Sequence, residues 1–204
     1  MTHTAEFAGR SVPSGRRWTQ RETVIVAALG IVFAVLYLAW VQLWLLAQAA
    51  IGPLSLDILF GFWCVVSVVA AYIIRKPFVA FGSEVIAATA EMLTGNPAGL
   101  ILVLTGVVQG AGAELPFALT RWRNYRLPTL LASGASAAIF SFVYTWIRFN
   151  YGTLAPGLLV TMCVLRVASG VLLAGLLGKV IGDALYRTGA LSGLAIDAGK
   201  RGAG

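Results

Sequence analysis

Four carboxylates lie where water would be scarce if the apolar stretches around them cross a membrane. Glu84, Glu91 and Glu114 stand inside long apolar runs, and Asp57 stands at the edge of another. Ionised side chains are costly inside a bilayer, so those found there usually pair with one another, contact ligands or carry protons. The four acids therefore predict a functional site or a set of ion pairs between helices.

The spacing of the polar residues favours helices that bend around a cavity. Glu84 and Glu91 are seven residues apart, which places them on one helix face about 10 Å apart along the axis. Gln109 and Glu114 stand among glycines and just before Pro116. Such a helix can bend and turn its freed carbonyl groups toward a cavity.

Two arginines supply counter-charges. Arg148 stands near the end of an apolar run, where its long side chain either reaches the membrane surface or faces the site. Arg166 lies about nine residues inside the last run, which is too deep for that. We expect it to pair with Glu114 or Glu84, with direct ligand contact as the alternative.

The remaining acids and the aromatic residues indicate the kind of ligand. For Glu91 we expect ligand contact, and for Asp57, which follows Pro53, a role at a helix N-terminus. The four acids outnumber the two arginines, and aromatic faces also attract positive charge. An organic cation is the favoured ligand, with a proton relay as the alternative; the nearby aromatic residues are Trp63, Tyr144 and Trp146.

Composition shows that the chain is a membrane protein. Of its 204 residues, 59% are hydrophobic and 11% charged, and the mean hydropathy is +0.86. Soluble domains have about 25% charged residues, and a spanning helix needs about 20 apolar ones. The apolar runs predict an all-helical protein with six transmembrane helices, at 22–49, 53–74, 77–93, 98–120, 128–149 and 157–186.

The basic residues predict the orientation. All Lys and Arg except Arg148 and Arg166 fall in the tails or in connections on one side of six crossings. The positive-inside rule then makes both termini cytoplasmic. The net charge of +7 reports this topology, and nucleic acid is a poor candidate partner. We expect a transmembrane domain over 22–187 between a basic tail (1–21) and a mobile tail (188–204).

Motifs of enzymes and energy-coupling proteins are missing from the sequence. Gly178-Lys179 is not followed by Ser or Thr, so there is no Walker A motif. His3, the single histidine, lies in a tail, so no metal site, cofactor or catalytic triad is expected. Cys64 and Cys163 fall within the spans, and we expect them to be packing residues.

The first apolar run carries a stripe of small residues. Ala27, Gly30 and Ala34 lie on one face, which lets another helix approach closely, either in a partner or within the subunit. Trp40 and Trp44 follow toward the other end of the run. We expect them to form an interfacial aromatic belt rather than a ligand platform.

Two motifs carry a resemblance to a known family. The stretches Glu91-Met-Leu-Thr-Gly-Asn-Pro97 and Gly106-Val-Val-Gln-Gly-Ala-Gly-Ala-Glu114-Leu-Pro-Phe117 are similar to the YkoE family. Its members are substrate-binding subunits (S components) of energy-coupling-factor (ECF) transporters. The resemblance covers about residues 20 to 188 and includes the size, the helix count and the cytoplasmic termini.

The resemblance implies a function and a set of partners. Family members are associated with uptake of thiamine or its hydroxymethylpyrimidine precursor, together with a transmembrane coupling protein and two ATPases. It implies docking to the coupling protein through Ala27, Gly30 and Ala34. The substrate-binding residues that we expect are Glu84, Glu91, Asn96, Gln109, Glu114, Trp63, Tyr144 and Arg166.

We therefore expect a multi-pass subunit of the bacterial cell membrane that binds a vitamin outside and delivers it inward, and that is not itself an enzyme. Two alternatives remain open. One is a solitary transporter in which Glu84, Glu91 or Glu114 carries protons. The other is a structural subunit whose acids and arginines only pair helices.

Overall fold

The first helix, α1 (Gln20–Ile51), begins at a capping box in the computed structural model, which describes residues 17–197. The Glu22 carboxylate accepts a hydrogen bond from Thr19 N at 2.7 Å, and Thr19 Oγ1 accepts one from Glu22 N at 3.3 Å. This reciprocal pair satisfies N–H groups that a helix start leaves free. The predicted basic and mobile tails fall partly at residues 1–16 and 198–204, which lie outside the described residues.

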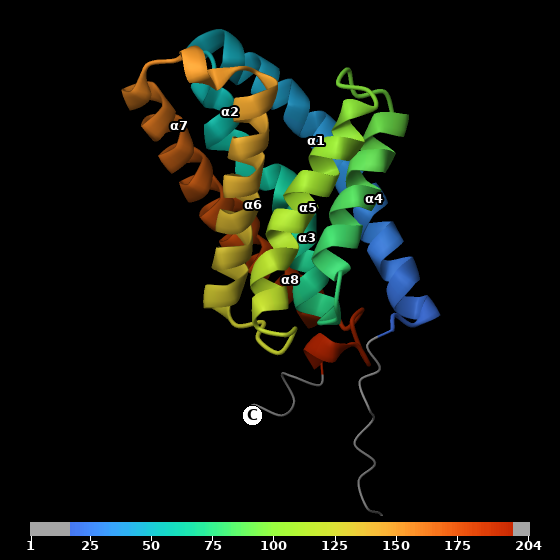
Figure 1. The fold of residues 1–204 in the computed structure, drawn as a ribbon. Coiled ribbons are helices and arrows are strands. Elements are labelled where there is room, and N and C mark those ends of the chain that lie inside the picture. The colour runs from blue at the N-terminus through green and yellow to red at the C-terminus, as the bar shows by residue number, and fades with distance from the viewer. Residues whose placement is uncertain (1–16, 198–204) are drawn as a thin grey trace, which may run out of the picture.

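The chain then runs up and down as a helical bundle (Figure 1). The elements that follow α1 are α2 (Leu54–Leu59), the 3₁₀ helix η1 (Phe60–Cys64), α3 (Val65–Ile74), α4 (Val79–Leu93), α5 (Ile101–Leu119), α6 (Leu127–Arg148), the 3₁₀ turn η2 (Tyr151–Thr153), α7 (Pro156–Ser169), the π-helix η3 (Gly170–Leu176) and α8 (Leu177–Arg187). The prediction of an all-helical membrane protein is confirmed.

The helices differ in whether they are long enough to cross a membrane. Five helical segments between residues 17 and 197 are long and apolar enough to cross a membrane. The other, α4, has 15 residues, or about 22 Å, against a hydrocarbon core of about 30 Å. Six crossings therefore stay a prediction, with α4 as the short one.

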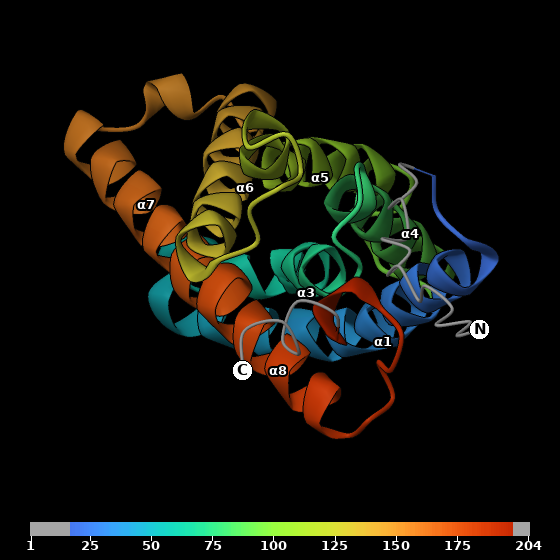
Figure 2. The ribbon, with the colours of Figure 1, turned by 90° about the horizontal axis from the view of Figure 1, so that it is seen from below.

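Helix α3 forms the centre of the bundle. All ten of its residues are buried, and it contacts α1, α4, α5, α6 and α8. Figure 2 shows it enclosed by these helices. Its residues are mostly Val, Ile and Ala, which is the composition of a helix that is apolar on all sides and has no solvent face.

Two helices lose regular geometry where they cross. A Cβ built on Gly61 would lie 2.1 Å from the carbonyl oxygen of Ser169, so only glycine permits this approach. Ser169 Oγ accepts a hydrogen bond from Gly61 N at 2.9 Å and donates one to the Ile58 carbonyl at 2.7 Å. The hydroxyl thus joins η1 to the start of η3, and irregular helix turns of this kind are frequent at functional sites.

The two ends of the bundle differ in charge. The start of α1, the connections 75–78 and 120–126 and the end of α8 lie at one end (bottom of Figure 1), and this end carries most of the described arginines and lysines. Residues 188–197, expected to be mobile, instead pack there, with Leu191, Leu194 and Ile196 buried. These apolar side chains, two and three residues apart, give the segment an inner face.

Candidate functional site

A cavity of about 400 Å³ lies toward the opposite end of the bundle, where the connections carry few charges. Its walls come from α1, α2, η1, α4, α5, α6 and α7 and from the connection between α4 and α5. The volume falls in the range of about 300–1,000 Å³ typical of small-molecule sites. This cavity is therefore large enough to hold a small molecule among the helices.

One wall of the cavity is acidic. Glu84 and Glu91 both line it and are each 2% exposed. Glu84 Oε2 accepts a hydrogen bond from Ser67 Oγ at 2.5 Å, and Glu91 Oε1 accepts one from Asn96 Nδ2 at 2.7 Å. Neither carboxylate forms a salt bridge with any described residue. Two buried acids without a protein cation require a cationic ligand or protons.

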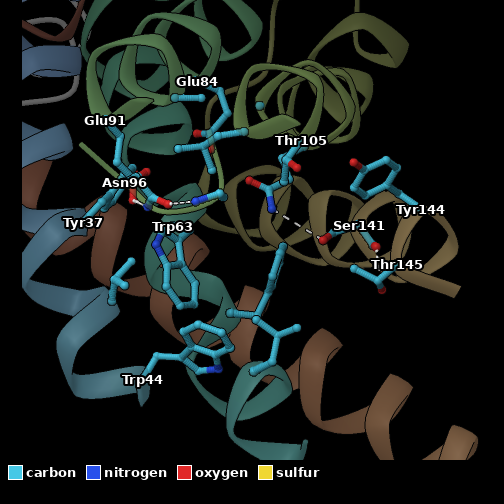
Figure 3. A pocket seen from close by; sticks show the side chains of 18 of the residues that line it. Tyr37, Trp44, Trp63, Glu84, Glu91, Asn96, Thr105, Ser141, Tyr144 and Thr145 are labelled. Atoms are coloured by element: carbon cyan, nitrogen blue, oxygen red, sulfur yellow. Dashed lines mark hydrogen bonds between the residues drawn. The ribbon is translucent and has the colours of Figure 1, made fainter. Parts of the chain in front are cut away.

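The turn after α4 holds Asn96 against this wall. Asn96 Oδ1 accepts a hydrogen bond from Ala98 N at 2.8 Å, and Asn96 N donates to the Glu91 carbonyl at 3.3 Å. Its side-chain amide is thereby fixed with the nitrogen toward Glu91, as Figure 3 shows. The turn at Glu91–Pro97 is thus held by hydrogen bonds within the motif and to Ala98, and it closes this side of the cavity.

The glycines of α5 bring a second polar wall close to the first. A Cβ on Gly106 would lie 2.5 Å from the Cβ of Ala88, and one on Gly110 would lie 3.1 Å from the Cβ of Glu84. Because α5 and α4 pack this tightly, Gln109 lines the cavity beside the acids. Its amide lies 3.5 Å from Ser141 Oγ on α6, at the limit of a hydrogen bond.

Arg166 is paired with a different acid from those predicted. Its Nε lies 2.6 Å from Asp57 Oδ1, and its Nη1 donates to Thr145 Oγ1 at 2.6 Å. Asp57 therefore neutralises Arg166 across the bundle, instead of acting only at a helix start, and Glu84 and Glu114 do not. Arg166 also lines the cavity, and its Nη2 has no partner.

Aromatic residues close the space between the polar walls. Trp63 and Trp44 line the cavity and meet edge to face, with ring centroids 6.3 Å apart. Trp44 was predicted to lie in an interfacial belt, but it faces inward because α1 presents Tyr37, Val41 and Trp44 on one face. The Trp44 Nε1 and Tyr144 hydroxyl groups are buried without a partner.

Figure 3 shows how these groups are arranged around the space. Glu84, Glu91 and Asn96 lie on one side, Ser141, Tyr144 and Thr145 lie on the other, and Trp63 and Trp44 border them. An acidic side thus faces a side rich in hydroxyl groups. Thr145 and Tyr37 were not among the predicted site residues. Thr145 could have been found from helix periodicity, because it lies four residues after Ser141 and therefore shares its face of the helix.

Glu114 is placed apart from this cavity. Its carboxylate accepts hydrogen bonds from Phe78 N at 2.7 Å, from Phe81 N at 3.1 Å and from Trp122 Nε1 at 2.6 Å, at the basic end of the bundle. These bonds satisfy N–H groups at the start of α4. Along α5, Glu114 lies nine residues beyond the cavity residue Thr105, or about 13 Å. It caps the start of α4 and does not line the cavity.

The stripe of small residues also has an internal role. A Cβ on Gly30 would lie 2.6 Å from Ile86 Cγ2, and Ala34 has no exposed surface. Gly30 packs α1 against α4, while Ala27 is half-buried. Gly30 therefore serves packing within the subunit, and docking of a partner through Ala27, Gly30 and Ala34 stays a prediction.

Comparisons with known proteins agree on the class of protein. Residues 21–140 match the family described as "ABC-type cobalt transport system, permease component". The chain is 44% identical over 181 residues, 89% of this chain and 91% of the relative, to the "Putative HMP/thiamine permease protein YkoE" of Bacillus subtilis (strain 168).

Between residues 17 and 197, no group of three or more His, Cys, Asp or Glu side chains is placed to hold a metal ion.

A solved structure gives the same result for the fold. The chain is similar, with a TM-score of 0.88 and 43% identity, to a protein described as "Crystal structure of an S-component of ECF transporter". The similarity covers 91% of this chain and 94% of that one. The family and fold are those of transport subunits and not of enzymes, and they place the protein in the bacterial cytoplasmic membrane as a multi-pass protein. The chain belongs to the YkoE family of ECF transporter S components.

Proposed function

We propose that this S component binds thiamine or hydroxymethylpyrimidine in the 400 Å³ cavity and delivers it inward with a coupling protein and ATPases. One observation carries the proposal: Glu84 and Glu91 are buried on a cavity wall without a cationic partner among the described residues. The name of the Bacillus subtilis relative, "Putative HMP/thiamine permease protein YkoE", supports this choice of substrate.

The chemistry of thiamine complements the walls. Its positively charged thiazolium ring can serve as the cationic partner that Glu84 and Glu91 do not have in the protein. Its aminopyrimidine offers N–H donors to carboxylate and amide oxygens. Trp63 and Tyr37 supply aromatic faces, which attract a flat cation. On the opposite side, Tyr144 and Ser141 offer hydroxyl groups for the alcohol that both candidate substrates carry.

The charge distribution supports capture from outside. The cavity lies toward the end of the bundle that is poor in lysine and arginine, and the basic end is opposite. Basic connections stay cytoplasmic, so the cavity end faces out. Without a Walker A sequence in this chain, release inward depends on the ATPases of partner subunits.

Calorimetric titration of the purified full-length chain tests the proposal. Saturable binding of thiamine, displaced by hydroxymethylpyrimidine, is expected without ATP or partners. Glu84→Gln and Glu91→Gln each remove a cavity charge, whereas Glu22→Gln removes the same charge at the basic end and serves as the matched control. No heat from either compound in a folded sample would reject both substrates.

Uptake in cells separates the proposal from the proton-coupled alternative. Buried carboxylates without cations also suit a proton carrier. Thiamine uptake by this chain that persists in a host without ECF ATPases, and that collapses when the proton gradient is removed, would favour that alternative. The proposal expects uptake only when the coupling protein and ATPases are present.

A further inference from the structure

A second hollow, of about 690 Å³, lies at the basic end of the bundle, away from the proposed substrate cavity. Four separate parts of the chain form it: the end of α3 with Arg75, the connection 120–126 with the start of α6, helix α8, and the segment after α8 at Ala195. Its lining residues include Tyr72, Arg75, Arg123, Tyr125, Arg126 and Lys179. The hollow has no part in substrate capture from outside.

The charged residues that line this hollow are all positive. Arg75, Arg123, Arg126 and Lys179 line it, and no acidic residue does. Lys179 pairs with Asp183 at 2.5 Å, but the three arginines form no salt bridge with an acid between residues 17 and 197. Topology explains why basic residues lie on this side. It does not require that cations from three parts of the chain converge on one hollow, where they repel each other.

Tyr125 supplies a second and independent sign of a ligand. Its ring stacks on Phe117 with centroids 5.2 Å apart, and the residue is 8% exposed. Its hydroxyl group is buried and has no hydrogen-bond partner. Burial raises the pKa of this phenol above its ordinary value, so the group stays a donor. An unpaired buried donor is destabilising, and a bound acceptor removes that cost.

The start of α6 adds a favourable helix terminus. This helix has 22 residues, and no side chain caps its first turn at Arg126. Pro128 has no N–H group, and Thr129 N donates to the Arg126 carbonyl at 3.0 Å, so the helix dipole is the feature that favours an anion there. The connection before it is held in place, because Trp122 Nε1 donates a hydrogen bond to Glu114 Oε1 at 2.6 Å. The hollow is therefore a built site and not only a gap between mobile loops.

We propose that this hollow binds a phosphate group at the cytoplasmic surface, contacted by Arg75, Arg123, Arg126 and Tyr125. A phosphate is an anionic partner of the kind that the three arginines do not have in the protein. Each guanidinium group can donate two parallel hydrogen bonds to its oxygens. The headgroup of an anionic phospholipid and a soluble phosphorylated compound share this chemistry. The site goes beyond the transport function, since it does not touch the substrate cavity.

Two probes distinguish the sources with the full-length protein. Phosphatidylglycerol retention is measured by native mass spectrometry after purification from nanodiscs that contain phosphatidylglycerol and phosphatidylcholine. Pyrophosphate binding is measured by calorimetry in neutral detergent. The test variant is Arg123→Gln/Arg126→Gln, and the control is Arg121→Gln/Arg187→Gln, which removes two charges that lie at the same end but outside the lining.

The expected result is saturable binding of at least one probe, weakened roughly tenfold or more in the test variant and unchanged in the control. Pyrophosphate binding identifies a soluble phosphate, and lipid retention that pyrophosphate does not displace identifies a headgroup. Tyr125→Phe should also weaken binding while leaving the thermal stability of the empty protein unchanged or higher. No saturable binding, equal losses in test and control variants, or unchanged affinity in Tyr125→Phe would overturn the proposal.

Discussion

The guanidinium of Arg166 and the carboxylate of Asp57 form an ion pair of 2.6 Å between α7 and α2, and neither side chain has any exposed surface. The two residues are 109 positions apart in the sequence. The pair fixes Arg166 between the rings of Phe60 and Phe142, whose centroids lie 5.5 and 5.4 Å from its guanidinium carbon. It thus joins the helices on the side of the cavity opposite the free acids.

Breaking this pair should strongly destabilise the protein. Asp57→Leu leaves the Arg166 cation buried without its counter-charge, and such a change costs about 3–5 kcal/mol. The melting temperature in detergent is the measurement. Lys179→Met is the control, because it breaks the partly exposed pair with Asp183, and surface pairs are worth about 0–1 kcal/mol.

A double variant separates charge from packing. Asp57→Leu/Arg166→Met removes both charges and keeps apolar volume between Phe60 and Phe142, so stability should recover most of the loss. Equal melting temperatures for Asp57→Leu and the double variant would mean that lost packing, and not the uncompensated cation, causes the destabilisation.

Charge removal in the cavity should change the choice between ligands. Glu91→Gln keeps the shape of the side chain and its position beside Asn96, but it no longer attracts a cation. We expect thiamine binding to weaken by about 1.5–3 kcal/mol, and binding of the neutral pyrimidine to weaken less. Competitive calorimetry gives both values. Equal losses for the two ligands would contradict a charge-specific role, and Glu22→Gln should alter neither.

Much of the fold was predictable because each transmembrane helix is a long apolar run. The predicted run at 22–49 became Gln20–Ile51, and that at 128–149 became Leu127–Arg148. The interruptions at η1 and η3 were not predictable, because uniformly apolar sequence carries no sign of where two backbones cross. That crossing depends on Gly61 meeting Ser169, 108 residues further on.

The site was predictable in its residue types and only partly in its partners. Seven of the eight expected substrate-binding residues line the cavity, the exception being Glu114. Helix periodicity gives the face that a residue shares with its neighbours but not the rotation of one helix against another. For that reason the sequence could not show that Arg166 meets Asp57, or that the face with Gly30 packs on α4.

Close packing of α4 on α5 should govern both stability and affinity. Gly106→Ala adds a methyl group 2.5 Å from the Cβ of Ala88, so the helices must separate, at a cost of about 1–3 kcal/mol. This moves Gln109 away from Glu84, and thiamine affinity should fall as well. Gly157→Ala is the control, because nothing lies within 4 Å of its added Cβ in α7. A Gly106→Ala protein with unchanged melting temperature and affinity would rule out this role.

Glu114 provides the sharpest test of where the site ends. Its carboxylate bonds the N–H groups of Phe78 and Phe81 and the indole of Trp122. Glu114→Ala should therefore lower stability by about 0.5–2 kcal/mol, the usual cost of losing a helix cap. Because the residue does not line the cavity, the folded variant should bind thiamine with unchanged affinity, whereas Glu91→Gln should not. Calorimetry below the melting temperature of both variants makes the comparison. A loss of affinity as large as that of Glu91→Gln would extend the binding site down α5 to the basic end, and would make the cap a part of the ligand machinery.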